Sequence, residues 1–154
     1  MRDAEVKELA KEVIKELAKQ QKDKRLHNTR LLMKNYNSLK NHLENVNEDI
    51  KDFEIEVEMG SKDSIWIMSI ARSKIRTAKM VGYVESAMKL IKDKFEKNLE
   101  AEKFRAFEMY YIDKKTNEEI QEELNCGKNS PKRWSDLIIE ELNVLLWGID
   151  ALGI

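Results

Sequence analysis

The chain has 154 residues, of which 37% are charged, only five are glycine and one is proline, and its formal net charge is −1. This length fits one domain, or one small domain with an extended helical arm, and the scarcity of turn-forming residues favours long helices over a sheet. The near-neutral total does not by itself indicate a nucleic-acid-binding protein, no run of about 18 apolar residues indicates a membrane span, and the single cysteine is typical of a reducing cytoplasm.

Residues 3–21 carry the clearest helical pattern and support an all-α fold. Val6, Leu9, Val13 and Leu17 recur at three- and four-residue spacing, which gives one apolar stripe along a helix. Acidic residues precede lysines by three positions on the other side. Because helices this short rarely persist alone, we expect this one to pack on another element.

A different pattern runs through residues 24–53. The apolar positions alternate steps of three and four residues, which is a heptad seam: Thr29, Leu32, Tyr36, Leu39, Leu43, Val46, Ile50 and Phe53. Such a seam pairs with a helix of the same chain or with a second copy, so a homodimer through 24–53 stays open beside intrachain packing. Residues 53–60 then alternate apolar and acidic residues, which is compatible with a strand, a frayed helix end or a linker.

We predict one long connecting helix over about 65–98, capped by Ser64 and open to kinks. Its predicted buried side comprises Ile67, Ile70, Ala71, Ile75, Ala78, Val81, Val84, Met88, Ile91 and Phe95. Arg72, Arg76 and Lys79 share an exposed face at steps of four and three residues. This row is either a solvated basic face or a set of contacts to DNA phosphates. A shorter helix follows over 100–112, with its aromatic residues directed to the core.

The stretch 116–146 begins with a short helix and a tight turn. Thr116 followed by Glu119 is the pattern of a capping box, which starts a helix at the next residue. Asn125 can adopt the left-handed conformation that ends such a helix, and Gly127 would relax the turn further.

A second, longer helix follows the turn. Pro131 is tolerated in a first turn, which places the start of this helix near 128–130, and Gly148 offers its end. Its predicted apolar stripe comprises Trp134, Leu137, Ile138, Leu142 and Leu145. Two helices joined in this way have the sequence form of a helix-turn-helix, whose second helix lies in the major groove of DNA.

The first turns of that second helix are polar and basic: Lys128, Asn129, Ser130, Lys132 and Arg133. Arginine and lysine suit guanine acceptors, asparagine suits adenine, and lysine and serine suit phosphates. The positive end of the helix dipole adds to the attraction for an anion. We therefore predict double-stranded DNA as the partner; the alternative is a helical hairpin with an ordinary basic cap.

From Phe104 onward, the chain resembles region 4 of sigma-70-type factors and, more closely, the ArpU/RinA-type transcriptional regulators of phages and prophages. The matching stretches are FEMYYIDKK, TNEEIQEEL and CGKNSPKRWSDLIIEEL. The stretch LHNTRLLMKNYNSLKNHLENV is similar to the helical N-terminal half of clostridial members. The resemblance implies DNA contacts from the five polar and basic residues named above, which we call the recognition turn. It also implies contacts of Lys114 and Lys115 with the DNA backbone. It also implies activation of late or mobile-element genes together with RNA polymerase, at the nucleoid of a bacterial host.

Three regions are predicted: an N-terminal helical region (1–60), a connecting helix (61–99) and a helix-turn-helix domain (100–154). His27 and His42 are too far apart on a helix to chelate one metal, and Cys126 has no partner cysteine, so we expect no enzyme, cofactor or metal. Two other functions stay open. One is a small terminase-like DNA-packaging subunit, and the other is a helical interaction module without nucleic acid.

Overall fold

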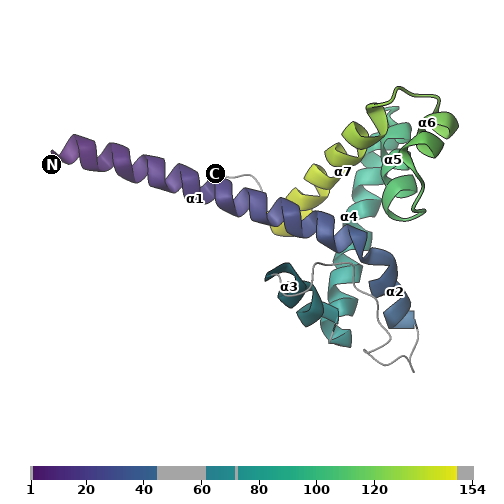
Figure 1. The fold of residues 1–154 in the computed structure, drawn as a ribbon, viewed down its shortest axis with the longest axis horizontal. Helices are drawn as coiled ribbons and strands as arrows, with labels where there is room; N and C mark the ends of the chain where they lie inside the picture. The colour runs from purple at the N-terminus through teal and green to yellow at the C-terminus, as the bar shows by residue number, and fades with distance from the viewer. Residues whose placement is uncertain (1, 45–61, 72, 149–154) are drawn as a thin grey trace.

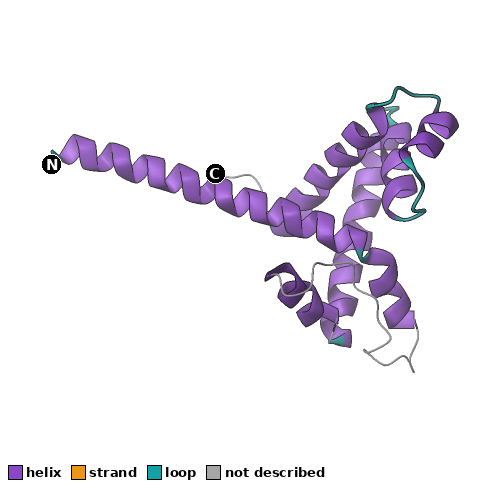
Figure 2. Cartoon of the chain, in the orientation of Figure 1, coloured by secondary structure: helices purple, strands orange, loops and turns teal. Residues whose placement is uncertain are grey.

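The computed structural model of the chain describes residues 2–44, 62–71 and 73–148. All regular secondary structure in these ranges is α-helical, which confirms the all-α prediction (Figures 1 and 2). The helices are α1 (Asp3–Lys34), α2 (Tyr36–Glu44), α3 (Lys62–Ala71), α4 (Lys74–Lys97), α5 (Ala101–Tyr111), α6 (Asn117–Leu124) and α7 (Ser130–Trp147). None of these helices is long and apolar enough to cross a membrane.

α1 is one helix of 32 residues, although the sequence divides this range into two patterns, 3–21 and 24–53. The helix breaks instead at Asn35, whose side-chain amide donates a hydrogen bond to the carbonyl of Leu31 at 2.9 Å. α2 then leaves in a new direction (Figure 1).

The first part of the heptad seam is used inside this chain. Its residues Thr29, Leu32, Tyr36 and Leu39 are all buried. Leu43 is half-buried and packs against the same core. This is the intrachain alternative of the two that the seam allows, whereas a homodimer through 24–53 stays a prediction. The last seam residues and the strand-like pattern of 53–60 lie outside the described residues.

The N-terminal part of α1 projects from the body as an arm, which we define as residues 3–24 (Figure 1). The first buried residue of α1 is Asn28, so the expected packing of the 3–21 helix on another element is not found among the described residues. Large apolar side chains, from Val6 to Leu17, are instead exposed. The arm stays helical because it continues a helix whose C-terminal part is packed, which removes the cost of starting a new helix.

The predicted helix over 65–98 is two helices. The first, α3, begins at Lys62 and not after Ser64. The second, α4, is capped by Ser73, whose hydroxyl accepts a hydrogen bond from the backbone N–H of Arg76 at 3.3 Å. The chain therefore changes direction between α3 and α4, within the 65–98 range for which the sequence leaves kinks open.

This turn resets the helical phase of α4. Ile75, which the continuous pattern places in the core, is 71% exposed, and Ala78 is exposed as well. The core position belongs to Thr77, whose hydroxyl lies 2.8 Å from the carbonyl of Ile70 at the end of α3. From Val81 onward, the predicted and observed buried faces agree, except that Ala87 is buried and Met88 is half-buried.

One core joins all three predicted regions. The most completely buried residues of this core come from α1, α2, α3, α4, α5 and α7: Leu32, Met33, Leu39, Ile67, Ile70, Ile91, Phe107, Ile138, Ile139 and Leu142. The described parts of the regions 1–60, 61–99 and 100–154 therefore contribute to one hydrophobic core. The aromatic residues of α5 are core residues as predicted, apart from Tyr110, which is 46% exposed.

A polar contact fastens α1 to the C-terminal end of α7, and we call Thr29, Asn143 and Trp147 the α1–α7 anchor. The hydroxyl of Thr29 lies 2.7 Å from Asn143 Oδ1 and accepts a hydrogen bond from Trp147 Nε1 at 2.8 Å. The guanidinium of Arg25 lies over the Trp147 ring, 4.8 Å from its centroid. Thr29 and Asn143 are buried, so these bonds replace lost contacts with water.

A second polar contact joins α2 to α4. The hydroxyl of Tyr36 donates a hydrogen bond to Glu85 Oε1 at 2.8 Å, and Lys40 Nζ lies 3.1 Å from the same oxygen. The bond from Tyr36 lowers the pKa of the Glu85 carboxyl, while burial and then this bond raise the pKa of Tyr36. Together the two contacts hold α1 on α7 and α2 on α4.

Candidate nucleic-acid interface

The first helix of the predicted helix-turn-helix begins and ends where the sequence predicts. The hydroxyl of Thr116 accepts a hydrogen bond from the backbone N–H of Glu119 at 3.2 Å, so α6 begins at Asn117. Asn125 ends it in the left-handed conformation, with φ 50° and ψ 54°. Gly127 is a smaller part of the turn than predicted, because the left-handed residue is Asn125 and a Cβ at Gly127 would make only ordinary contact, 3.7 Å from Ser130 Oγ.

The second helix also begins where the sequence predicts. α7 starts at Ser130 with Pro131 in its first turn, and it ends at Gly148, whose φ is 63°. Its buried face differs in part from the predicted stripe, because Leu137 and Leu145 are 36% and 50% exposed. Ser135, Ile139 and Asn143 are buried in their place, since α1, α4 and α5 all pack on α7.

α6 is held on the body by a small apolar cluster. Ile120 is its one buried residue among those described, and it packs with Ala106 and Met109 of α5. Leu124 and Trp134 are half-buried against the same cluster. Ile120, Leu124 and Trp134 therefore form an apolar frame that fixes the first turn of α7 relative to α6.

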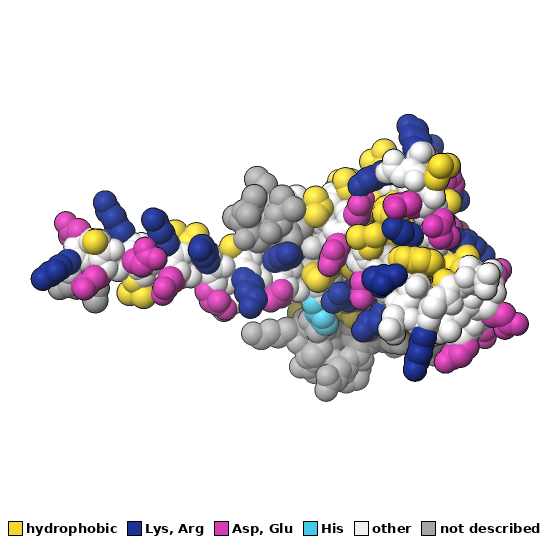
Figure 3. Space-filling model, turned by 90° about the horizontal axis from the view of Figure 1, so that it is seen from above, with side chains coloured by type: hydrophobic (Ala, Val, Ile, Leu, Met, Phe, Trp, Pro, Cys, Tyr) yellow, Lys and Arg dark blue, Asp and Glu magenta, His cyan; other side chains and the backbone are white. Residues whose placement is uncertain are grey.

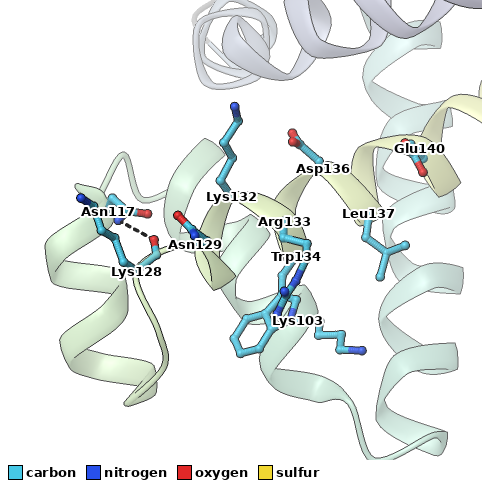
Figure 4. Close-up of a pocket in the computed structure, with 10 residues that line it drawn as sticks. All are labelled: Lys103, Asn117, Lys128, Asn129, Lys132, Arg133, Trp134, Asp136, Leu137 and Glu140. Carbon is cyan, nitrogen blue, oxygen red and sulfur yellow. Dashed lines mark hydrogen bonds between the residues drawn. The ribbon is translucent and has the colours of Figure 1, made fainter.

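An open groove of about 960 Å³ lies beside that first turn (Figure 4). It is lined by Lys103, Asn117, Lys128, Asn129, Lys132, Arg133, Trp134, Asp136, Leu137 and Glu140. Four of the five residues predicted for the recognition turn are among them. The fifth, Ser130, is half-buried and does not line the groove.

Lys132 and Arg133, two basic residues of the groove, point in different directions. Figure 4 shows Lys132 projecting to one side of α7, while Arg133 projects to the other, toward Trp134 and Lys103. This follows from the turn of about 100° between successive helical residues. Lys103, on α5, was not predicted. Its nearness to α7 depends on how α5 and α7 pack, which no local sequence signal shows.

Asn129 occupies the N-cap position of α7 but does not cap it. The residue has φ −92° and ψ −9°, and its side chain makes no capping hydrogen bond. The amide is exposed in the groove, where both its oxygen and its N–H groups are available to a ligand. The turn is held from α6 instead, because Asn117 Nδ2 donates a hydrogen bond to the carbonyl of Lys128 at 3.2 Å.

Lys114 and Lys115 are both engaged within the protein. Lys114, whose φ is 55°, donates a hydrogen bond from Nζ to the carbonyl of Lys34 at 3.0 Å. Lys115 Nζ lies 2.9 Å from Glu123 Oε2, and this hydrogen bond lowers the pKa of the Glu123 carboxyl. Neither lysine lines the groove.

The predicted phosphate row on α4 lies elsewhere. Arg76 and Lys79 are exposed near the beginning of α4, at the opposite end of the body from α6 (Figure 1). The guanidinium of Arg76 is hydrogen-bonded to the Ser69 hydroxyl of α3. Arg72 lies outside the described residues. The fold therefore does not bring this row together with the first turn of α7.

Acidic residues limit the basic surface on the C-terminal side of the groove. Asp136 lies 4.0 Å from Arg30 of α1, and Glu140 is exposed one turn further along α7. Along the turn and α7, the basic residues are thus confined to positions 128–133, and Lys103 of α5 adds a further positive charge to the groove. Among the described residues, no group of three or more histidine, cysteine, aspartate or glutamate side chains is placed to hold a metal ion.

Comparison with known proteins gives no relative for this chain: no protein-family model, no curated protein and no solved structure matches it.

Proposed function

We propose that the chain is a sequence-specific regulator of transcription that binds double-stranded DNA through the first turn of α7. The observation that supports this most is a set of exposed groups around one helix N-terminus: Lys128, Asn129, Lys132 and Arg133. Within the described residues, the side chains of these four form no hydrogen bond or ion pair with the protein. Because these side chains are not bonded to other parts of the protein, a ligand can replace the water around them without breaking a contact of the fold.

The chemistry of this set matches the edge of a duplex. Arginine and lysine can bond to guanine O6 and N7, and asparagine can bond to adenine N6 and N7. The helix dipole and the remaining lysines attract phosphates, which sets the register of the protein on the duplex. Acidic residues at 136 and 140 keep the DNA at the first turns of α7.

The wider role that we propose follows the resemblance to ArpU/RinA-type regulators. The protein would activate late or mobile-element genes together with RNA polymerase, in the cytoplasm of a bacterial host and at its nucleoid. Lys114 and Lys115 remain candidates for backbone contacts, for which Lys115 would exchange Glu123 for a phosphate.

The first test uses Arg133→Ala. A binding site is selected from a random duplex library with the unaltered chain, and affinity is then measured by fluorescence anisotropy. We expect the substitution to weaken specific binding by about 1–3 kcal/mol and to relax the preference at one base pair. Affinity of the unaltered chain should fall steeply as salt rises, because bound phosphates release counterions.

The matched control is Lys15→Ala, which removes a positive charge on the arm, far from the groove. It should leave the affinity within about twofold, since charges beyond the Debye length are screened. Failure of the unaltered chain to select any duplex, or to lose affinity with salt, would favour the interaction module without nucleic acid.

Asn129→Ala separates a structural from a functional role for this asparagine. A capping asparagine costs about 1 kcal/mol of stability when it is removed, but Asn129 makes no capping bond. We therefore expect urea denaturation to show a change of less than about 0.5 kcal/mol in the free energy of unfolding. Affinity for the selected duplex should nevertheless fall by about 1–3 kcal/mol. The reverse result, lost stability with unchanged binding, would assign Asn129 to the fold.

A further inference from the structure

The arm exposes an apolar stripe that no other described part of the chain covers. Its large side chains are between 48% and 65% exposed: Val6, Leu9, Val13, Ile14 and Leu17. Hydrophobic side chains lie among charged ones along the arm in Figure 3. Five such side chains on one face of an exposed helix form a contiguous patch, which is typical of an interaction surface.

The two edges of this stripe carry opposite charges. One edge carries lysines, in a row with steps of four, three and four residues: Lys7, Lys11, Ile14 and Ala18. The other edge carries glutamates, in a row with the same steps: Glu5, Leu9, Glu12 and Glu16. Residues at such steps lie above one another on a helix, so the stripe has a basic edge and an acidic edge.

This arrangement is complementary to itself in one orientation only. When two identical helices pair in parallel about a two-fold axis, the left edge of one meets the right edge of the other. The lysines of each copy then face the glutamates of its partner on both sides of the stripe. In an antiparallel pair, each edge meets its own copy, so lysine faces lysine and glutamate faces glutamate.

We propose that the arm is the surface through which two copies of this chain associate, in parallel and along the stripe from Val6 to Leu17. A nucleic acid or an anionic membrane would be repelled by Glu12 and Glu16, whereas a second copy satisfies both edges. The stripe ends well before Asn28, where the body begins to bury α1, so pairing requires no rearrangement of the core. The proposal does not depend on DNA binding.

Association should be moderate and reversible. The stripe spans about 17 Å of helix, which is short for a paired helix, so we expect a dissociation constant on the order of micromolar. Sedimentation equilibrium of the full chain over a wide concentration range should show a monomer–dimer equilibrium. Val13→Asp, which places a charge within the stripe, should raise the dissociation constant at least about tenfold. Glu8→Gln, on the polar side of the arm, should leave it within about twofold.

The charged edges are tested by paired reversals. The variant Glu12→Lys/Glu16→Lys has two basic edges, and Lys7→Glu/Lys11→Glu has two acidic edges. We expect each variant to be monomeric alone and an equimolar mixture of the two to form a one-to-one dimer. Recovery in the mixture also shows that the reversed arms are still helical.

Cross-linking determines the orientation of the pair. In a Cys126→Ser background, Val6→Cys should form a disulfide with its own copy under mild oxidation, because position 6 meets position 6 in a parallel pair. Cross-links between Val6→Cys and Ala18→Cys chains, without self-linked Val6→Cys, would show an antiparallel pair and overturn the proposal. A chain that stays monomeric at every accessible concentration would also overturn it, and so would a ring of eight or more subunits, the assembly expected of a terminase-like protein.

Discussion

Thr29→Val should lower the free energy of unfolding by about 2–4 kcal/mol, although it changes one hydroxyl to a methyl group of similar size. The substitution leaves Asn143 Oδ1 and Trp147 Nε1 without the partner that lies 2.7 Å and 2.8 Å from them. Each buried polar atom that loses its hydrogen bond costs about 1–3 kcal/mol, and the half-buried Trp147 recovers part of that from water. Urea denaturation followed by tryptophan fluorescence measures the change.

Thr29→Ser is the matched control, because it keeps the hydroxyl and removes only a methyl group. We expect it to cost about 1 kcal/mol, the transfer energy of one buried methyl group. Equal losses in both variants would mean that packing around Thr29, and not the α1–α7 anchor, supplies the stability. A loss in Thr29→Val that disappears in an Asn143→Leu background would assign the cost to the unpaired amide.

Ile120→Ala should cost about 2–5 kcal/mol of stability and should also disable binding to DNA. Ile120 is fully buried and is the one buried residue among those described in α6. An eight-residue helix does not persist without such a contact. α6 should therefore detach from α5 before the rest of the protein unfolds, and the turn that presents Lys128 and Asn129 should detach with it.

Amide hydrogen exchange in α6 measures this local loss directly. Exchange there should accelerate far more than in α4, whose core contacts are elsewhere. Ile120→Val, with an expected cost of about 0.5–1.5 kcal/mol, should keep both the protection of α6 and most of the DNA affinity. Uniform acceleration over the whole chain would contradict the local role that we assign to this cluster.

The C-terminal helices could be predicted because their ends depend on local chemistry. The hydroxyl of Thr116, the left-handed conformation of Asn125 and the fixed ring of Pro131 act within a few residues of sequence, and each marks the boundary that the structure shows. Positions of exposed side chains on the first turn of α7 follow from the same boundaries. Local signals of this kind need no knowledge of the fold.

Errors arose where tertiary packing decides. The new helix start at Ser73 shifts the helical phase of α4. As a result Ile75, which the continuous pattern predicts to be buried, is exposed, and Thr77 is buried. The periodicity predicts a single apolar stripe that includes Leu137 and Leu145, whereas α7 is covered from several sides and buries a different set of residues. Lys103 lines the groove because α5 packs against α7. The periodicity within one helix does not predict how two helices pack.

α7 is one unbroken helix of 18 residues that carries the groove at its first turn and the α1–α7 anchor near its end. A continuous helix bends little, and the anchor fixes α1 on the end of α7. The direction of the arm, which is part of α1, therefore determines the direction of the proposed DNA-reading turn. For two molecules joined by their arms on DNA, the separation of the two reading turns would then be a fixed property of the protein. An operator whose half-sites are moved apart by about 5 base pairs, half a turn of the duplex, would present the second half-site on the wrong side. Spacing between half-sites, and not only their sequence, would thus determine which promoters the protein occupies.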